Sequence, residues 1–138
     1  MTSKLNPYLS FQNNAREAME FYQSVFGGKL TMSTFKEFNV SQDPKMDNLI
    51  MHAELEAENG IKFMAADTPD SMVYKPGDSI RMTLSGENEK ELKSYFEKLS
   101  SGGLVTQPLE KAPWGDSFGM VVDKFGITWF VNIISQKG

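Results

Sequence analysis

The chain has 138 residues, of which 40% are hydrophobic and 23% are charged, and its 14 basic and 18 acidic residues give a net charge of −4. This composition is typical of one folded domain, and the small negative charge without a basic cluster argues against nucleic acid as a partner. Cysteine is absent, which excludes disulfides and thiolate chemistry. No apolar run is long enough for a membrane span or a secretory signal, so we expect a cytoplasmic protein with no membrane partner.

The first predicted elements are a strand over residues 5–11 and a helix behind it. Alternation along the strand places a polar set on one face, namely Asn6, Tyr8 and Ser10. The helix has apolar residues at steps of three and four, and it ends near Gly28. It begins at Asn14, with Glu17 three residues later, which predicts a variant of the capping box. The start of the chain therefore reads as strand and then amphipathic helix.

Three more strands are predicted before the middle of the chain. They run over Lys29–Glu37, Leu49–Ala57 and Ile61–Asp67. A turn at Asn59 and Gly60 joins the last two strands, and a polar loop over Ser41–Asn48 precedes them. The segment Pro69–Asp78 is rich in proline and glycine, and we interpret it as a linker.

The second half repeats this pattern. A strand over residues 79–85, a helix capped by Asn88 with Glu91, and three strands over Leu104–Leu109, Phe118–Val122 and Ile127–Ile134 follow in the same order. Residues match at offsets of 75 in the first strand (Leu9 to Leu84), 74 in the helix and the glycine after it (Gly28 to Gly102), and 66 in the last strand (Gly60 to Gly126). We therefore predict an α+β fold of two βαβββ modules, residues 1–68 and 79–138, within a single domain 1–138.

Three segments carry a resemblance to a known family: "NPYLSFQNNAREAMEFYQSVFGG", "MHAELEAENGIKFMAAD" and "FGMVVDKFGITWFVNI". The chain resembles, over its whole length, the vicinal oxygen chelate superfamily of glyoxalases, bleomycin-resistance proteins and dioxygenases. Within it, the chain looks most like the PhnB-like group, often labelled a 3-demethylubiquinone methyltransferase domain. The resemblance implies curved mixed sheets with the helices on the convex face and a ligand cavity on the concave face.

Metal-dependent members of that superfamily carry His or Gln in the first strand of each module and Glu in the last. By resemblance these positions fall on Asn6 and Arg81, and on Met64 and Phe130. Met64 and Phe130 offer no hard donor, and the charge of Arg81 repels a cation. The resemblance therefore implies that the metal site is lost, and we expect no cofactor. The methyltransferase label also lacks support, since no glycine-rich loop follows the first strand.

The only histidine, His52, provides a second hypothesis. A strand places His52 and Glu54 on one face, and the hairpin would bring Asp67 beside them as a substitute metal or acid–base cluster. With an even loop length that face also holds Phe63, and Met64 lies on the opposite, cavity-facing side. A hydrogen-bonded surface histidine is the alternative.

The predicted cavity contains one cation, Arg81. A guanidinium there suits a carboxylate, phosphate or phosphonate, while an exposed residue or a structural ion pair is the alternative reading. Trp114, in a loop with proline and glycine, is either a wall of the cavity or a satellite of the core. The complete predicted ligand-binding set is Arg81, Asn6, Tyr8, Thr83, Met64, Phe130, Asn132 and Trp114.

Three functions agree with these residues. The first is a small-molecule-binding protein without a metal, with a ligand that is a small anion. The second is a metal-dependent isomerase or dioxygenase, and the third is a metal-independent enzyme that uses Tyr8, His52 or Arg81. We favour the first and leave open whether the protein is an enzyme. Because short curved sheets leave edges and apolar surface uncovered, we also expect a homodimer.

Overall fold

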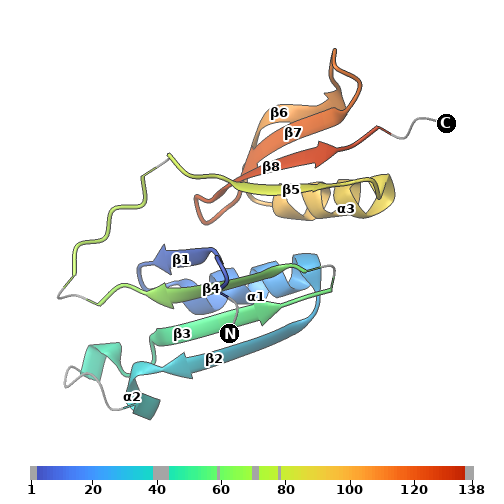
Figure 1. Ribbon diagram of the computed structural model, residues 1–138. Helices are drawn as coiled ribbons and strands as arrows, with labels where there is room; N and C mark the ends of the chain where they lie inside the picture. The colour runs from blue at the N-terminus through green and yellow to red at the C-terminus, as the bar shows by residue number, and fades with distance from the viewer. Residues whose placement is uncertain (1–2, 39–43, 59, 70–71, 78, 136–138) are drawn as a thin grey trace. The chain divides into compact units, whose positions relative to one another are not determined.

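A computed structural model of the protein describes residues 3–38, 44–58, 60–69, 72–77 and 79–135. The chain divides into two compact units, Met1–Pro76 and Gly77–Gly138. Each unit has one four-stranded mixed sheet with a helix packed on it (Figure 1). Within the described ranges, no helix has the length and hydropathy that a membrane crossing requires.

The described residues of the first unit form four strands, two α-helices and a short 3-10 helix. In chain order these are β1 (Tyr8–Phe11), α1 (Ala15–Phe26), β2 (Lys29–Thr34), α2 (Phe35–Phe38), η1 (Pro44–Met46), β3 (Ile50–Glu56) and β4 (Lys62–Asp67). The sheet has the order β1-β4-β3-β2, in which β1 and β4 are parallel and the other pairs antiparallel.

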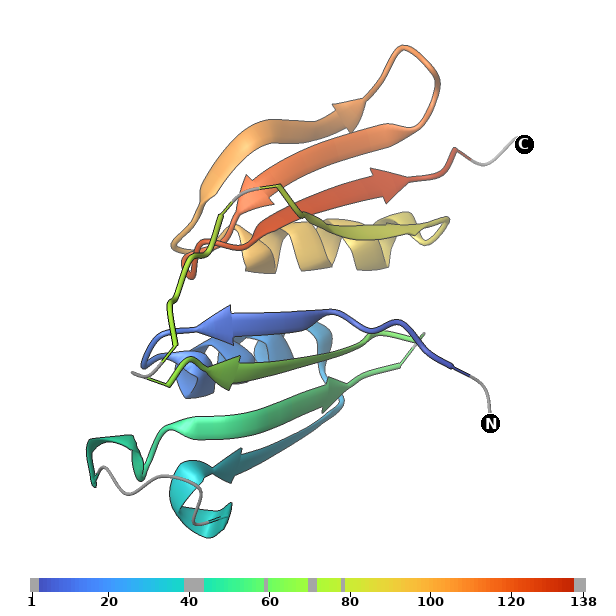
Figure 2. The ribbon, with the colours of Figure 1, turned by 60° about the vertical axis from the view of Figure 1, so that its left-hand side comes forward.

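The second unit repeats this topology. Its elements are β5 (Met82–Gly86), α3 (Glu89–Leu99), β6 (Leu104–Lys111), β7 (Ser117–Val122) and β8 (Thr128–Ile133). The sheet order is β5-β8-β7-β6, again with a parallel first pair. Both views show one long helix against one face of each sheet (Figure 2). The predicted α+β fold of two βαβββ modules is therefore confirmed.

The two long helices bury equivalent side chains. α1 buries Ala18, Tyr22 and Val25, and α3 buries Leu92, Phe96 and Leu99, each 74 residues later. In the first unit Tyr22 and Phe26 both meet the ring of Phe63 edge-on, at 5.6 and 6.2 Å between centroids. The core of each unit thus lies between its long helix and its sheet. Among the described residues of each unit, no long helix packs on the opposite face of the sheet, here called the helix-free face.

One predicted helix cap is confirmed and the other is wrong. The Asn88 side chain accepts a hydrogen bond from the N–H of Glu91 at 3.0 Å, as an N-cap does, and its amide also donates to the Glu91 carboxylate at 3.3 Å. Asn14 makes no such bond. Instead Asp67, at the end of β4, accepts from the N–H of Ala15 at 2.9 Å. A carboxylate distant in sequence therefore caps α1.

The strand predicted over Lys29–Glu37 ends earlier, at Thr34. There the chain turns into α2, because the N–H of Phe35 donates to Leu49 and the hydroxyl of Thr34 accepts from the N–H of Glu37. The turn buries Phe35, which is 7% exposed. The first predicted strand also begins later, at Tyr8. Of the predicted polar loop, residues 41–43 lie outside the described ranges, as does Asn59 of the predicted turn.

The glycine match after the helices is shifted by one residue. Gly28 and Gly103 both approach the backbone of the neighbouring strand end so closely that a Cβ would collide, at Glu56 and Ala57 in one unit and at Val122 and Asp123 in the other. Gly103 therefore takes the place of Gly28, and the expected match with Gly102 is wrong. The second unit has one residue fewer than the first between its first strand and its helix, which lowers the sequence offset from 75 to 74. One additional residue before β6, Gly103, restores the offset of 75.

Candidate functional site

The helix-free face of the first sheet carries two of the predicted ligand residues side by side. Tyr8 on β1 and Met64 on β4 are Cα partners, and Glu54 on β3 is the next partner in that row. The expectation, made for an even loop length, that His52 and Glu54 lie on the other face of the sheet from Met64 is wrong. The β3–β4 loop spans five residues, an odd number, with the N–H of Ala57 bonded to the carbonyl of Ile61 at 2.8 Å. This loop puts Glu54 on the face of Met64.

The same strand register places Asp67 on the opposite face of the sheet from Glu54, away from the predicted cluster. Asp67 points to the helix side, is 3% exposed, and accepts from the N–H groups of Ala15 and Ile50 at 2.9 and 2.8 Å. Glu54 forms an ion pair with Lys62 at 3.4 Å. Within the described ranges, no group of three His, Asp or Glu side chains could hold a metal ion. The substitute cluster of His52, Glu54 and Asp67 is therefore wrong.

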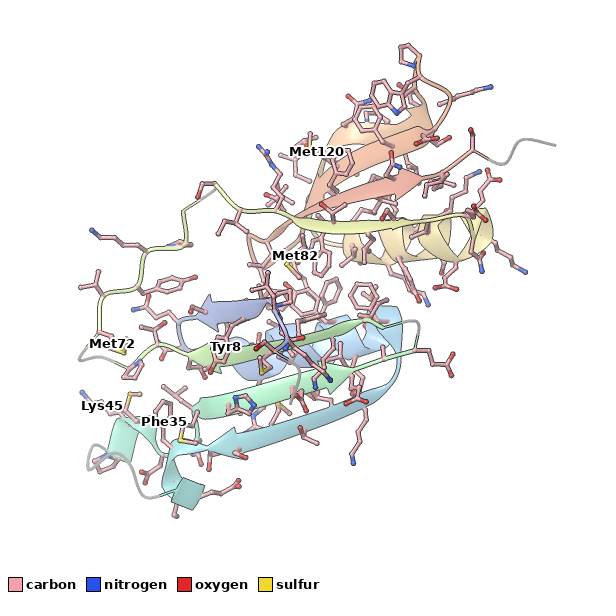
Figure 3. All side chains as sticks on the ribbon, viewed as in Figure 1. Tyr8, Phe35, Lys45, Met72, Met82 and Met120 are labelled. Atoms are coloured by element: carbon pink, nitrogen blue, oxygen red, sulfur yellow. The ribbon has the colours of Figure 1, made fainter. Side chains whose placement is uncertain are left out.

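His52 instead lies near Tyr8, with ring centroids 6.1 Å apart. Tyr8 also borders a cavity of about 300 Å³ in the first unit. The wall of this cavity includes Phe35 and Met72, and Figure 3 shows these two side chains with Tyr8 on the same part of the unit. Burial raises the pKa of Tyr8 above its ordinary value, so the hydroxyl stays protonated at neutral pH and can donate a hydrogen bond. Sequence reasoning missed Phe35 and Met72.

The helix-free face of the second sheet carries a row of stacked rings. Trp114 stacks on Phe118 at 5.1 Å between centroids and 25° between planes, and Phe118 stacks on Phe130 at 5.4 Å and 22°. We call these three residues the aromatic row. Phe118 and Phe130 alternate along their strands with Gly119, Val121 and Val131, all buried on the helix side. Trp114 stacks on Phe118 of this face and is 62% exposed, so it is not part of the core.

Polar residues surround the aromatic row. Thr83 on β5 is the Cα partner of Phe130, and Asn132 on β8 is the partner of Phe118. Three residues of the predicted set, Thr83, Phe130 and Asn132, are therefore neighbours, with Trp114 at the end of the row. Met120, labelled in Figure 3, completes the row of Thr83 and Phe130. Phe118, which connects Trp114 to the sheet, was not predicted.

Asp116 holds the loop that carries Trp114. Its carboxylate accepts from the N–H of Ser135 at 2.9 Å and from the amide of Asn132 at 3.2 Å, which ties the β6–β7 loop to the end of β8. The hydrogen bond from the Ser135 backbone, followed by that from Asn132, lowers the pKa of Asp116 below its usual range. The carboxylate is therefore ionised at neutral pH, and the tie is in place.

Arg81 immediately precedes β5, two residues before Thr83, and is exposed. Among the residues the structure describes, no carboxylate lies within salt-bridge distance of its guanidinium. Asn6 is half-buried just before β1. The predicted pocket takes Asn6 and Tyr8 from one unit and Arg81, Thr83 and Asn132 from the other, and it stays a prediction.

The four positions matched to the superfamily's metal ligands do not fit a divalent cation. The strand register makes Met64 and Phe130 equivalent, since Met64 is the partner of Tyr8 and Phe130 the partner of Thr83. The thioether of Met64 is a weak donor, and the ring of Phe130 is engaged in the aromatic row. Arg81 brings a positive charge. The amide of Asn6 offers one weak neutral oxygen, so the four residues do not supply a full set of oxygen and nitrogen ligands.

A methyl-donor site is also not apparent in the fold. The connection from β1 to α1 consists of Gln12, Asn13 and Asn14, without a glycine. The mixed four-stranded sheets differ from the doubly wound parallel sheet in which a glycine-rich loop holds a nucleotide-type cofactor.

Comparison with known proteins identifies the family. Residues 3–132 match the family described as 3-demethylubiquinone-9 3-methyltransferase. The structure is similar to that of protein PA1353 from Pseudomonas aeruginosa, with 33% identity, a TM-score of 0.83, and coverage of 98% of this chain and 100% of that one. It is also similar to a PhnB protein from Bacillus cereus, with 28% identity, a TM-score of 0.74, and coverage of 96% and 100%.

A more distant structure shows the fold alone. A member of the glyoxalase/bleomycin resistance protein/dioxygenase superfamily from Sphaerobacter thermophilus has 19% identity and a TM-score of 0.58, with coverage of 97% of this chain and 100% of that chain. The predicted resemblance to the PhnB-like group is confirmed, and the fold is the one that this superfamily member has.

Proposed function

The chain belongs to the 3-demethylubiquinone-9 3-methyltransferase family, with the fold of the glyoxalase and bleomycin-resistance superfamily, and from this premise we propose that it binds a small anionic molecule without a metal ion. The ligand lies on the helix-free face of the second sheet, beside Arg81. We further propose that the protein acts in the cytoplasm as a homodimer.

One observation carries this proposal: the helix-free face of the second sheet presents apolar rings, a hydroxyl group and an amide near a cation. Small-molecule sites combine a mostly apolar lining with a few polar groups that fix orientation. The aromatic row supplies the first part, and Thr83 and Asn132 supply the second. The exposed guanidinium of Arg81, which has no carboxylate partner among the described residues, supports an acidic ligand.

The same positions support the proposal that no metal ion is bound. Phe130 stands where a metal-dependent relative would carry its glutamate, and its ring is part of the aromatic row. The position serves as apolar contact surface and not as a ligand atom. Binding in this protein therefore depends on stacking and charge, and a chelator should leave it unchanged.

The chain contains two arginines, which provides a matched test. Arg81→Met removes the proposed cation, while Arg16→Met makes the same chemical change at an exposed position of α1 in the other unit. The probes are 2-naphthoate and its saturated counterpart decahydro-2-naphthoate, titrated by calorimetry. Weaker binding of both anions to Arg81→Met, with unchanged binding to Arg16→Met, supports the proposal. Absence of binding to the natural protein, or equal affinity in both variants, overturns it.

A metal-independent enzyme is the second candidate, because Tyr8 borders a cavity and its ring lies 6.1 Å from that of His52. A protonated phenol next to an imidazole could serve as an acid–base pair. If this candidate is right, His52→Gln abolishes turnover of a bound compound and leaves its affinity unchanged. If no compound that binds is ever converted, the protein is a binding protein only.

A further inference from the structure

The aromatic row runs across the second sheet, towards a strand that has no ring to continue it. Its members come from the β6–β7 loop, then β7, then β8. Neighbouring strands lie about 4.8 Å apart, close to the 5.1 and 5.4 Å between the stacked centroids. The step from Phe118 on β7 to Phe130 on β8 therefore advances by one strand. The next strand is β5, where the Cα partner of Phe130 is Thr83.

Thr83 leaves the next ring position open. Its side chain is small and exposed, and the neighbours Met82 and Leu84 alternate to the other face of β5. Among the described residues of the second unit, Phe118 is the one ring stacked on Phe130, so no second ring of this unit stacks on the outer side of Phe130. A planar ring placed over Thr83 would extend the row in the offset-stacked geometry that aromatic pairs prefer.

The charge beside this position identifies the rest of the ligand. Arg81 precedes Thr83 by two residues, about 7 Å along an extended chain, and carries a guanidinium without a carboxylate partner among the described residues. A ring over Thr83 that carries an acidic group at its edge can bring that group within reach of the long arginine side chain.

The row is held in place before any ligand arrives. Asp116 fixes the Trp114 loop to β8 through Ser135 and Asn132, and the N–H of Ala112 closes the same loop on the carbonyl of Asp116 at 2.7 Å. A surface that is already ordered loses little conformational entropy on binding. This ordering favours a rigid, flat ligand over a flexible chain.

We propose that the ligand is a planar aromatic acid, whose ring stacks on Phe130 over Thr83 and whose acidic group meets Arg81. This inference rests on the proposed function and adds the chemical class of the ligand. It predicts that aromaticity, and not only charge and size, determines affinity.

The test compares 2-naphthoate with decahydro-2-naphthoate, which has the same charge and a saturated ring system. We expect 2-naphthoate to bind about five to ten times more tightly, as one stacked pair permits. In methyl NMR spectra, 2-naphthoate should shift the γ-methyl of Thr83 upfield by its ring current, and the saturated acid should not.

Two variants at one position complete the test. Thr83→Phe fills the open position with a ring of the protein and should weaken 2-naphthoate binding about tenfold, to the level of the saturated acid. Thr83→Val removes the hydroxyl but leaves the ring position open, so it should weaken both acids by about the same factor and keep the preference for 2-naphthoate. Phenylalanine and valine are both favoured in strands, and an amide NMR spectrum confirms that each variant is folded.

The outcomes separate this inference from the proposed function. Equal affinities for the two acids, with no effect of Thr83→Phe on 2-naphthoate, overturn the aromatic class. If Arg81→Met then still weakens both acids, the proposed anion binding stands. If neither acid binds to the natural protein, both proposals fail.

Discussion

The structure gives Asp67 a role that is open to a quantitative test. Its two carboxylate oxygens accept from the first N–H of α1, that of Ala15, and from the first N–H of β3, that of Ile50. Asp67 is 3% exposed, and both donors belong to residues with no exposed surface. The side chain therefore joins the end of β4 to the starts of a helix and a strand, and removing it leaves two buried donors without partners.

The size of the effect follows from those two bonds. A buried donor left unsatisfied costs about 1–3 kcal/mol, so Asp67→Ala should lower the free energy of unfolding by about 2–6 kcal/mol. Asp67→Asn keeps one acceptor oxygen and turns an N–H₂ towards the other donor, so it should lose about half of that. A domain of this size has about 5–15 kcal/mol of total stability, so the alanine variant should be close to unfolding.

Urea denaturation followed by circular dichroism measures these losses. The matched control is Glu56→Gln, which removes an exposed carboxylate from the end of β3 and should change stability by less than about 0.5 kcal/mol. If Asp67→Ala is as stable as the control, the two hydrogen bonds do not carry the role assigned to them. If a divalent metal stabilises the natural protein but not Asp67→Asn, a metal-binding role for Asp67 is correct after all.

Three further predictions concern charge and assembly. Arg81→Met should weaken anion binding by about 1 kcal/mol, or fivefold, in calorimetric titrations, and Arg16→Met should keep the affinity of the natural protein. A buried arginine would contribute about 1.5–3 kcal/mol, but Arg81 is exposed. The hydrogen bond from the Ser135 N–H to Asp116 should be fully formed above the ordinary carboxyl pKa of 3.8 and be lost as the pH falls through the lowered pKa of Asp116. The amide NMR signal of Ser135 reports this loss, and a transition centred above pH 3.8 would contradict it. Light scattering at micromolar concentration should give twice the mass of the 138-residue chain, and a monomeric mass rejects the homodimer.

The helices and the repeat could be predicted because their signals are local. Apolar residues at steps of three and four mark the buried stripes of α1 and α3, and the constant offset of 74 pairs Tyr22 with Phe96 in the sequence and in the structure. The first and last strands match at the predicted offsets for the same reason, since alternation along a strand is visible in a few residues.

The errors arose where a long-range contact decides the outcome. Asn14 has the chemistry of a cap but makes no such bond, and the side chain that accepts from the start of α1 is Asp67 of another element, bonded to the N–H of Ala15, which no local pattern shows. The face of His52 and Glu54 depends on whether the β3–β4 loop has an odd or even number of residues, because a shift of one residue exchanges the faces of a strand.

The candidate site was predicted in part. Thr83, Phe130 and Asn132 share one face because alternation predicts faces well. The aromatic row needed the structure, since Phe118 joins a loop tryptophan to a ring on the next strand only through the β7–β8 register. The exposure of Arg81 also depends on the folded surroundings, and a sequence pattern does not report it.

Metal-independent binding of an anion is the central claim, and one measurement tests it most directly. The affinity for 2-naphthoate is measured by calorimetry on protein treated with EDTA, and again after addition of Zn²⁺, Mn²⁺ or Ni²⁺. We predict the same dissociation constant in every case, because Met64, Phe130 and Arg81 supply no ligand set for a cation. Binding that disappears with EDTA and returns with one stoichiometric metal ion would contradict the claim.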